Sequence, residues 1–162
     1  MNTVYIQSMR AESDGTRDKE RDMEYNLERF RKAQSHEYET ALQEIRNGRK
    51  ESHWIWYIFP QLKELGYSST AKYYGLDGRG EAEAYIEDDV LRGRLIEISE
   101  ALLSLDSSNP LEVMGYPDNL KLRSCMTLFA IVYPETDVFS RVLDKFYSGE
   151  KDEKTVALLR KA

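Results

Sequence analysis

Both tryptophans of the chain and one of its two histidines lie within ten consecutive residues, 52–61, with the sequence SHWIWYIFPQ. Large aromatic side chains bury about 150–250 Å² each, so this segment has to lie in the core or line a pocket. Its imidazole, indole, phenol and amide groups each cost about 1–3 kcal/mol if they are buried without a hydrogen-bond partner. We therefore expect this segment to lie at the centre of the fold, beside any binding site.

The same ten residues could form a strand or a helix. Tryptophan, isoleucine, tyrosine and phenylalanine are all favoured in strands. No partner strand is evident elsewhere in the sequence, however, so we predict a helix that Ser52 caps and Pro60 ends. In such a helix His53 and Tyr57 share one face.

Helical spacing recurs along most of the chain. The clearest helix has apolar residues at intervals of 4, 3, 4 and 3 and can be capped by Asp88 or Asp89. A later helix, over residues 120–132, is apolar on every side in its second half, which is typical of a buried helix. The stripe of the clearest helix consists of Leu91, Leu95, Ile98, Leu102 and Leu105.

The pattern as a whole predicts an all-α protein. We expect an irregular single-domain helical bundle of about nine mostly short helices over residues 24–162, after a flexible polar N-terminal segment at 1–23. One helix is expected to start at Asn26 and a second at Ser35, because both are good N-cap residues that precede helical spacing.

Composition limits the classes of function. The 162-residue length is about that of one domain, which can bury roughly two thirds of its unfolded surface. A net charge of −6 argues against general nucleic-acid binding and against adhesion to an anionic membrane surface. No apolar run approaches the ~18 residues of a membrane span, and the first residues lack a secretory signal, so we expect a cytoplasmic protein.

The single cysteine, Cys125, cannot form an internal disulfide. It lies in the apolar half of its helix, where we expect a small hydrophobic residue with a raised thiol pKa and no catalytic role. Two histidines and one cysteine without metal-ligand spacing predict no metal site. Residues 75–80 lack the strand and the lysine of a phosphate-binding loop, so no cofactor is expected either.

Two cationic residues, Lys121 and Arg123, lie near the start of a helix. The positive end of the helix dipole disfavours cations there unless an anion is bound. Arg123 lies roughly 200° around the helix from Lys121, so both cannot reach one ligand, whereas Ser124 shares a face with Lys121. The alternative is an Asp118–Lys121 pair together with a salt bridge from Arg123 to an acidic neighbour.

The candidate site combines this helix turn with the aromatic segment. His53 is the candidate catalytic residue, handling a proton or a hydrogen bond to the ligand, and the alternative is a histidine that is only packed beside the tryptophans. One tryptophan is expected in the core and the other in the pocket, and the sequence does not say which. The expected ligand-binding residues are Trp54, Trp56, Gln61, Lys121, Arg123 and Ser124.

Four segments resemble a known family: residues 52–61, 65–68 (LGYS), 118–129 (DNLKLRSCMTLF) and 142–146 (VLDKF). They are similar to the domain-of-unknown-function family 1810, and the resemblance extends from about residue 25 to about residue 159. It implies a small, mainly helical, intracellular protein and supplies no biochemical activity. Cys125 departs from the family pattern, which more often has a serine at this position.

These features favour a small-molecule binding or enzymatic domain whose pocket lies between residues 52–61 and 118–124. The aromatic wall can hold a planar group and the cationic helix turn an anionic one, so a small anionic, nucleotide-like or phosphorylated ligand is expected. No reaction type and no oligomeric state follow from the sequence. The alternative is a protein–protein interaction module with a structural polar core and no catalysis.

Overall fold

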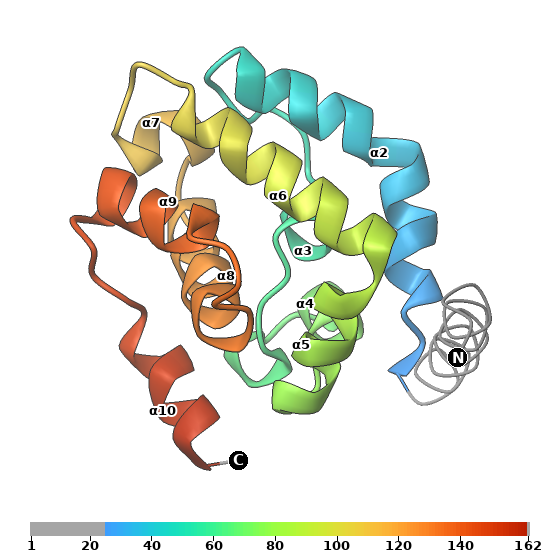
Figure 1. Cartoon of the computed structure of the whole chain (residues 1–162). Helices are drawn as coiled ribbons and strands as arrows, with labels where there is room; N and C mark the ends of the chain where they lie inside the picture. The colour runs from blue at the N-terminus through green and yellow to red at the C-terminus, as the bar shows by residue number, and fades with distance from the viewer. Residues whose placement is uncertain (1–24, 162) are drawn as a thin grey trace, which may run out of the picture.

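The computed structural model describes residues 25–161, and within this range nine α-helices and one 3-10 helix pack together without a β-strand (Figure 1). The expected all-α fold of about nine mostly short helices is confirmed. An isolated parallel bridge joins Leu62 and Leu76. The segment expected to be flexible, residues 1–23, lies outside the described residues.

The α-helices range from 4 to 19 residues in length. In chain order the elements are α2 (Glu28–Arg46), α3 (Ile55–Ile58), the 3-10 helix η1 (Lys63–Leu65), α4 (Ser69–Tyr74), α5 (Gly78–Glu87), α6 (Asp89–Leu103), α7 (Pro110–Met114), α8 (Asp118–Val132), α9 (Val138–Tyr147) and α10 (Glu153–Lys161).

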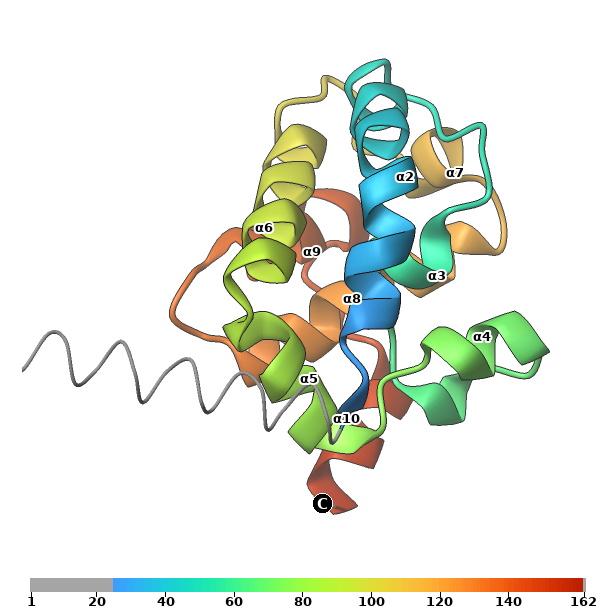
Figure 2. The ribbon, with the colours of Figure 1, turned by 90° about the vertical axis from the view of Figure 1, so that its right-hand side faces the viewer.

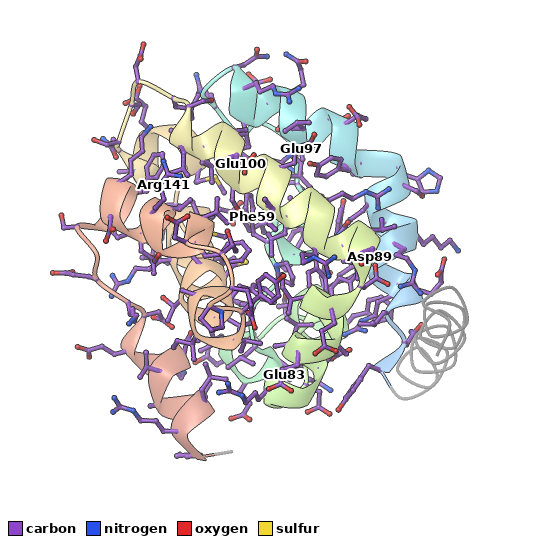
Figure 3. All side chains as sticks on the ribbon, viewed as in Figure 1. Phe59, Glu83, Asp89, Glu97, Glu100 and Arg141 are labelled. Atoms are coloured by element: carbon purple, nitrogen blue, oxygen red, sulfur yellow. The ribbon has the colours of Figure 1, made fainter. Side chains whose placement is uncertain are left out.

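Four helices, α2, α6, α8 and α9, form the main body. Helix α6 packs against α2 on one side and α9 on the other, and α9 packs against α8 (Figure 1). From Leu122 to Phe129 every side chain of α8 except that of Arg123 is buried. The apolar second half was expected to be buried throughout, but residues 130–132 at its end are only half-buried. Phe59, which follows α3, lies in the interior of the bundle, whereas Arg141 lies on its outside (Figure 3).

Both ends of α6 are held by side chains. Asp88 accepts hydrogen bonds from the N–H groups of Val90 and Leu91, so it is the cap that the sequence predicted. At the other end, the Lys145 ammonium from α9 complements the negative end of the helix dipole. It donates to the carbonyl groups of Leu102, Leu103 and Leu105.

Two expected boundaries near the start of the bundle are wrong. Asn26 does not cap α2: it has a φ of 53°, and the helix begins at Glu28. Ser35 starts no second helix, because α2 continues through it and its hydroxyl donates to the Lys32 carbonyl. A serine inside a helix can satisfy its hydroxyl on the preceding turn, so it does not require a break.

The aromatic segment is less helical than predicted. Only Ile55–Ile58 forms a helix, and Trp54 rather than Ser52 occupies the N-cap position. Ser52 is held by a tertiary contact instead, since its hydroxyl donates to the Glu44 carboxylate of α2 at 2.6 Å. The rest of the segment therefore has irregular backbone that contacts with other helices hold in place.

Residues 61–76 form an excursion from the main body that carries η1 and α4. Two backbone hydrogen bonds close its base: the Lys63 N–H donates to the Leu76 carbonyl at 2.8 Å, and the Leu76 N–H donates to the Gln61 carbonyl at 2.9 Å. Gly75 permits this closure, because a Cβ there would stand 2.5 Å from the Lys63 Cα. The excursion places α4 beside α3, at the side of the molecule (Figure 2).

Candidate functional site

Glu44 of α2 holds the start of the aromatic segment. Its carboxylate accepts hydrogen bonds from the backbone N–H groups of Glu51 and Ser52, from the Ser52 hydroxyl, and from the Trp54 Nε1–H at 2.9 Å. Burial by itself raises the pKa of this carboxyl group, but the hydrogen bonds outweigh it and lower the pKa to about 2. Trp54 is fully buried, so it is the tryptophan of the core.

A second network joins this segment to the start of α8. The Lys50 ammonium lies 2.8 Å from one carboxylate oxygen of Asp118, and the Lys121 ammonium lies 3.6 Å from the other. Lys50 is nearly buried, and its ammonium also lies 4.8 Å from the Trp54 ring centre. The alternative Asp118–Lys121 pair therefore exists. Two ammonium groups and one carboxylate leave this network with a net charge of +1.

A hollow lies between α3, α4 and α8, and we call it the α3–α4–α8 hollow. It occupies about 230 Å³ including space open to solvent, but the centre of a water molecule can reach only about 10 Å³ of it, so it has room for about one water molecule. Segments 52–61 and 118–124, which were expected to meet, both contribute to it. The hollow is lined by Ile55, Trp56, Phe59, Gln61, Ala71, Tyr74, Gly75 and Lys121.

Trp56 and Lys121 form the polar part of the hollow with Gln61. The Lys121 ammonium lies 5.2 Å from the Trp56 ring centre, within the range of a cation–π contact. The Trp56 Nε1 atom is buried and finds no hydrogen-bond acceptor among residues 25–161. A buried donor without an acceptor costs about 1–3 kcal/mol. Trp56 is therefore the tryptophan of the candidate site.

His53 lies outside the hollow. Its side chain is exposed and makes no hydrogen bond or ion pair with any residue that the structure describes. No neighbouring group among the described residues is thus in place to orient the imidazole or exchange a proton with it, and the geometry does not support the catalytic role expected for it.

Arg123 and Ser124 also lie outside the hollow. Arg123 donates from Nη2 to the Lys151 carbonyl at 3.0 Å, and its Nε is buried without an acceptor in the described part of the chain. The partner of Arg123 is thus a backbone carbonyl, and not the acidic side chain expected in the alternative to an anion site. Ser124 is buried and its hydroxyl donates to the Leu120 carbonyl at 3.2 Å. The rotation of roughly 200° along α8 separates Arg123 from Lys121, as the helix geometry predicted.

The α4 wall is absent from the site that the sequence predicted. Ala71, Tyr74 and Gly75 supply it, and the Tyr74 ring lies 5.1 Å from the ring of Tyr57. Burial raises the pKa of Tyr74, so its phenol stays protonated and able to donate at neutral pH. The sequence does carry a signal for this wall, namely two adjacent tyrosines directly before a glycine, which lets backbones approach closely.

Other chemistry in the described residues is limited. Between residues 25 and 161 no three His, Cys, Asp or Glu side chains are grouped so as to hold a metal ion. In the same range no helix is both long enough and apolar enough to cross a membrane. Cys125 is fully buried in α8, and burial raises the pKa of its thiol well above the ordinary value, as expected for a small core residue.

Comparison with known proteins gives two matches. The model of a family described as "Protein of unknown function (DUF1810)" matches residues 24–159. The chain is also similar to the conserved hypothetical protein Rv1873 from Mycobacterium tuberculosis, whose crystal structure is known at 1.38 Å. The two sequences are 42% identical with a TM-score of 0.82, over 84% of this chain and 97% of that one. No curated protein matches the chain.

Proposed function

This chain belongs to the DUF1810 family, whose description assigns no activity, and from that premise we propose that the protein binds a small anionic ligand in the α3–α4–α8 hollow. The family resemblance noted in the sequence is confirmed by this membership. One observation carries the proposal: the Lys121 ammonium lies against the Trp56 indole, whose N–H is buried and has no acceptor in the described residues.

The chemistry of the lining supports an anion. The Lys121 ammonium, the Trp56 N–H and the Gln61 amide can all donate hydrogen bonds, and an anion supplies the acceptor oxygens. Aromatic and aliphatic walls lower the local dielectric, which strengthens a charged hydrogen bond. The described residues that line the hollow include no histidine, carboxylate or thiol, so the proposal is one of binding and names no reaction.

A thermal-shift experiment with benzoate, phenyl phosphate and AMP as probes tests the proposal. Binding to the folded state raises the melting temperature by mass action, so at least one probe should raise it. Lys121→Met keeps most of the side-chain volume but removes the charge, and should abolish the shift. The matched control is Lys72→Met, because Lys72 is exposed on α4 and does not line the hollow. Silence of every probe, or equal shifts in the two variants, would show the proposal to be wrong.

The second candidate is a protein–protein interaction module. It is favoured by large apolar side chains exposed around the α7–α8 connection: Leu111, Tyr116 and Leu120 are 53%, 76% and 47% exposed. Exposed apolar residues are common on soluble proteins, so this observation is weaker than the unpaired donor in the hollow. Silence of all three probes would make the interaction module the better account.

A further inference from the structure

We infer that the ligand of the α3–α4–α8 hollow is a singly charged carboxylate on an apolar body, such as an aromatic acid, rather than a phosphate. The inference rests on the proposed function and names the ligand class within it. Three features of the hollow carry it: the net charge beside it, the number of its strong donors, and the character of its walls.

The charge favours a monoanion. Lys50 and Lys121 share the Asp118 carboxylate, so these three groups carry a net charge of +1, and the ionised Glu44 carboxylate, joined to Lys50 through Ser52 and Trp54, adds no positive charge. Of the described residues that line the hollow, Lys121 alone is cationic, because Arg123 is turned towards the Lys151 carbonyl. A phosphate ester carries about −1.5 to −2 at pH 7 and would leave negative charge unmatched where water is partly excluded. A carboxylate carries −1 and matches the network.

The donors fit the two oxygens of a carboxylate. The Lys121 ammonium can donate to one oxygen and the Trp56 Nε1–H to the other. The ammonium lies 5.2 Å from the centre of the indole ring that carries this N–H. The carboxylate would thereby supply the acceptor that the Trp56 N–H lacks among residues 25–161.

The walls fit an apolar body. Ile55, Phe59 and Ala71 are buried hydrophobic residues, and Tyr74 adds a half-buried aromatic ring. The hollow has room for about one water molecule, so the ligand has to displace a wall outward. Helix α4 buries Ala71 alone, fewer residues than α3 or α8, so we take α4 as the wall that the ligand displaces. The ligand's apolar body would then pack between α3 and α4.

Isothermal titration calorimetry on the full chain at pH 7 tests the inference with three probes: benzoate, phenyl phosphate and acetate. Benzoate and phenyl phosphate share the ring and differ in the charge, whereas acetate lacks the ring. We expect benzoate to bind about tenfold more tightly than phenyl phosphate, which is about 1.4 kcal/mol of binding free energy, and more tightly than acetate.

Each other outcome identifies the step that fails. Phenyl phosphate binding as tightly as benzoate, or more tightly, would overturn the charge argument and leave the proposed function standing. Acetate binding as tightly as benzoate would overturn the apolar body. Silence of all three probes would overturn the inference, and silence of AMP as well in the thermal-shift experiment would overturn the proposed function.

A variant tests the charge argument separately. Asp118→Asn raises the net charge of the network from +1 to +2, so the preference for benzoate over phenyl phosphate should fall about tenfold or reverse. A folded Asp118→Asn protein with the wild-type preference would contradict the argument. Because Asp118 also pairs with nearly buried Lys50, the melting temperature of the variant is measured first. If it does not fold, the wild-type comparison decides.

Discussion

Replacement of Glu44 by glutamine should lower the free energy of unfolding by about 2–4 kcal/mol. The carboxylate accepts four hydrogen bonds, from two backbone N–H groups, the Ser52 hydroxyl and the Trp54 indole. Glutamine can keep its one oxygen on the three N–H groups and turn its NH₂ towards the Ser52 hydroxyl, which then accepts instead of donating, so the variant loses the charge of the acceptor rather than a partner. A hydrogen bond to a charged group contributes about 1.5–3 kcal/mol and a neutral one about 0.5–1.5 kcal/mol, so the loss is about 1 kcal/mol for each bond before solvent screening of the partly exposed Glu44 reduces it.

Urea unfolding followed by tryptophan fluorescence measures this effect as a lower midpoint at an unchanged slope. Glu39→Gln is the matched control, because Glu39 is exposed on the same helix and its replacement should change stability by less than about 0.5 kcal/mol. A double-mutant cycle of Glu44→Gln with Trp54→Phe isolates the indole hydrogen bond, with an expected coupling of at least about 0.5 kcal/mol. Equal losses in the Glu44 and Glu39 variants would refute the reasoning.

The remaining predictions concern pH, a helix end and two glycines. The pKa of Glu44 in the folded protein is about 2, below its ordinary 4.5, so the stability that its carboxylate contributes is complete above about pH 4.5 and is lost as the pH falls through about 2. When unfolding is measured against pH, the free energy of unfolding should therefore fall less over this range in Glu44→Gln than in the wild type. Lys145→Met removes the hydrogen bonds to the carbonyl end of α6 and should cost about 1–2 kcal/mol in thermal melts, whereas Lys154→Met, on the exposed face of α10, should cost little. Gly93→Ala, inside α6 with open space around a new Cβ, should stabilise by about 0.5–1 kcal/mol. Gly75→Ala, whose Cβ would stand 2.5 Å from a backbone carbon of η1, should destabilise by about 1–3 kcal/mol. If both glycine variants changed the free energy of unfolding in the same direction, the packing around these two positions would be contradicted.

The sequence predicted about half of the candidate site. It placed Trp56, Gln61 and Lys121 in one pocket, and all three line the hollow. Helix geometry predicted that Lys121 and Arg123 point to different sides of α8, because position around a helix is a local property, but it did not determine which of the two lies beside the hollow. His53 precedes α3 and lies outside the hollow, next to Ser52, whose hydroxyl donates to Glu44 of α2, a contact that the sequence of residues 52–61 does not indicate.

Local sequence determined the helices themselves, since each backbone hydrogen bond of a helix joins residues four apart and an apolar stripe shows at once which face is buried. That is why the cap at Asp88 and the burial of residues 126–129 of α8 could both be predicted. Tertiary structure alone decided which tryptophan enters the core, because the acceptor that satisfies the Trp54 indole is Glu44 on another helix. It also decided that α4 forms one wall of the hollow. Packing between distant segments depends on their positions in space, which the spacing of residues along the sequence does not determine.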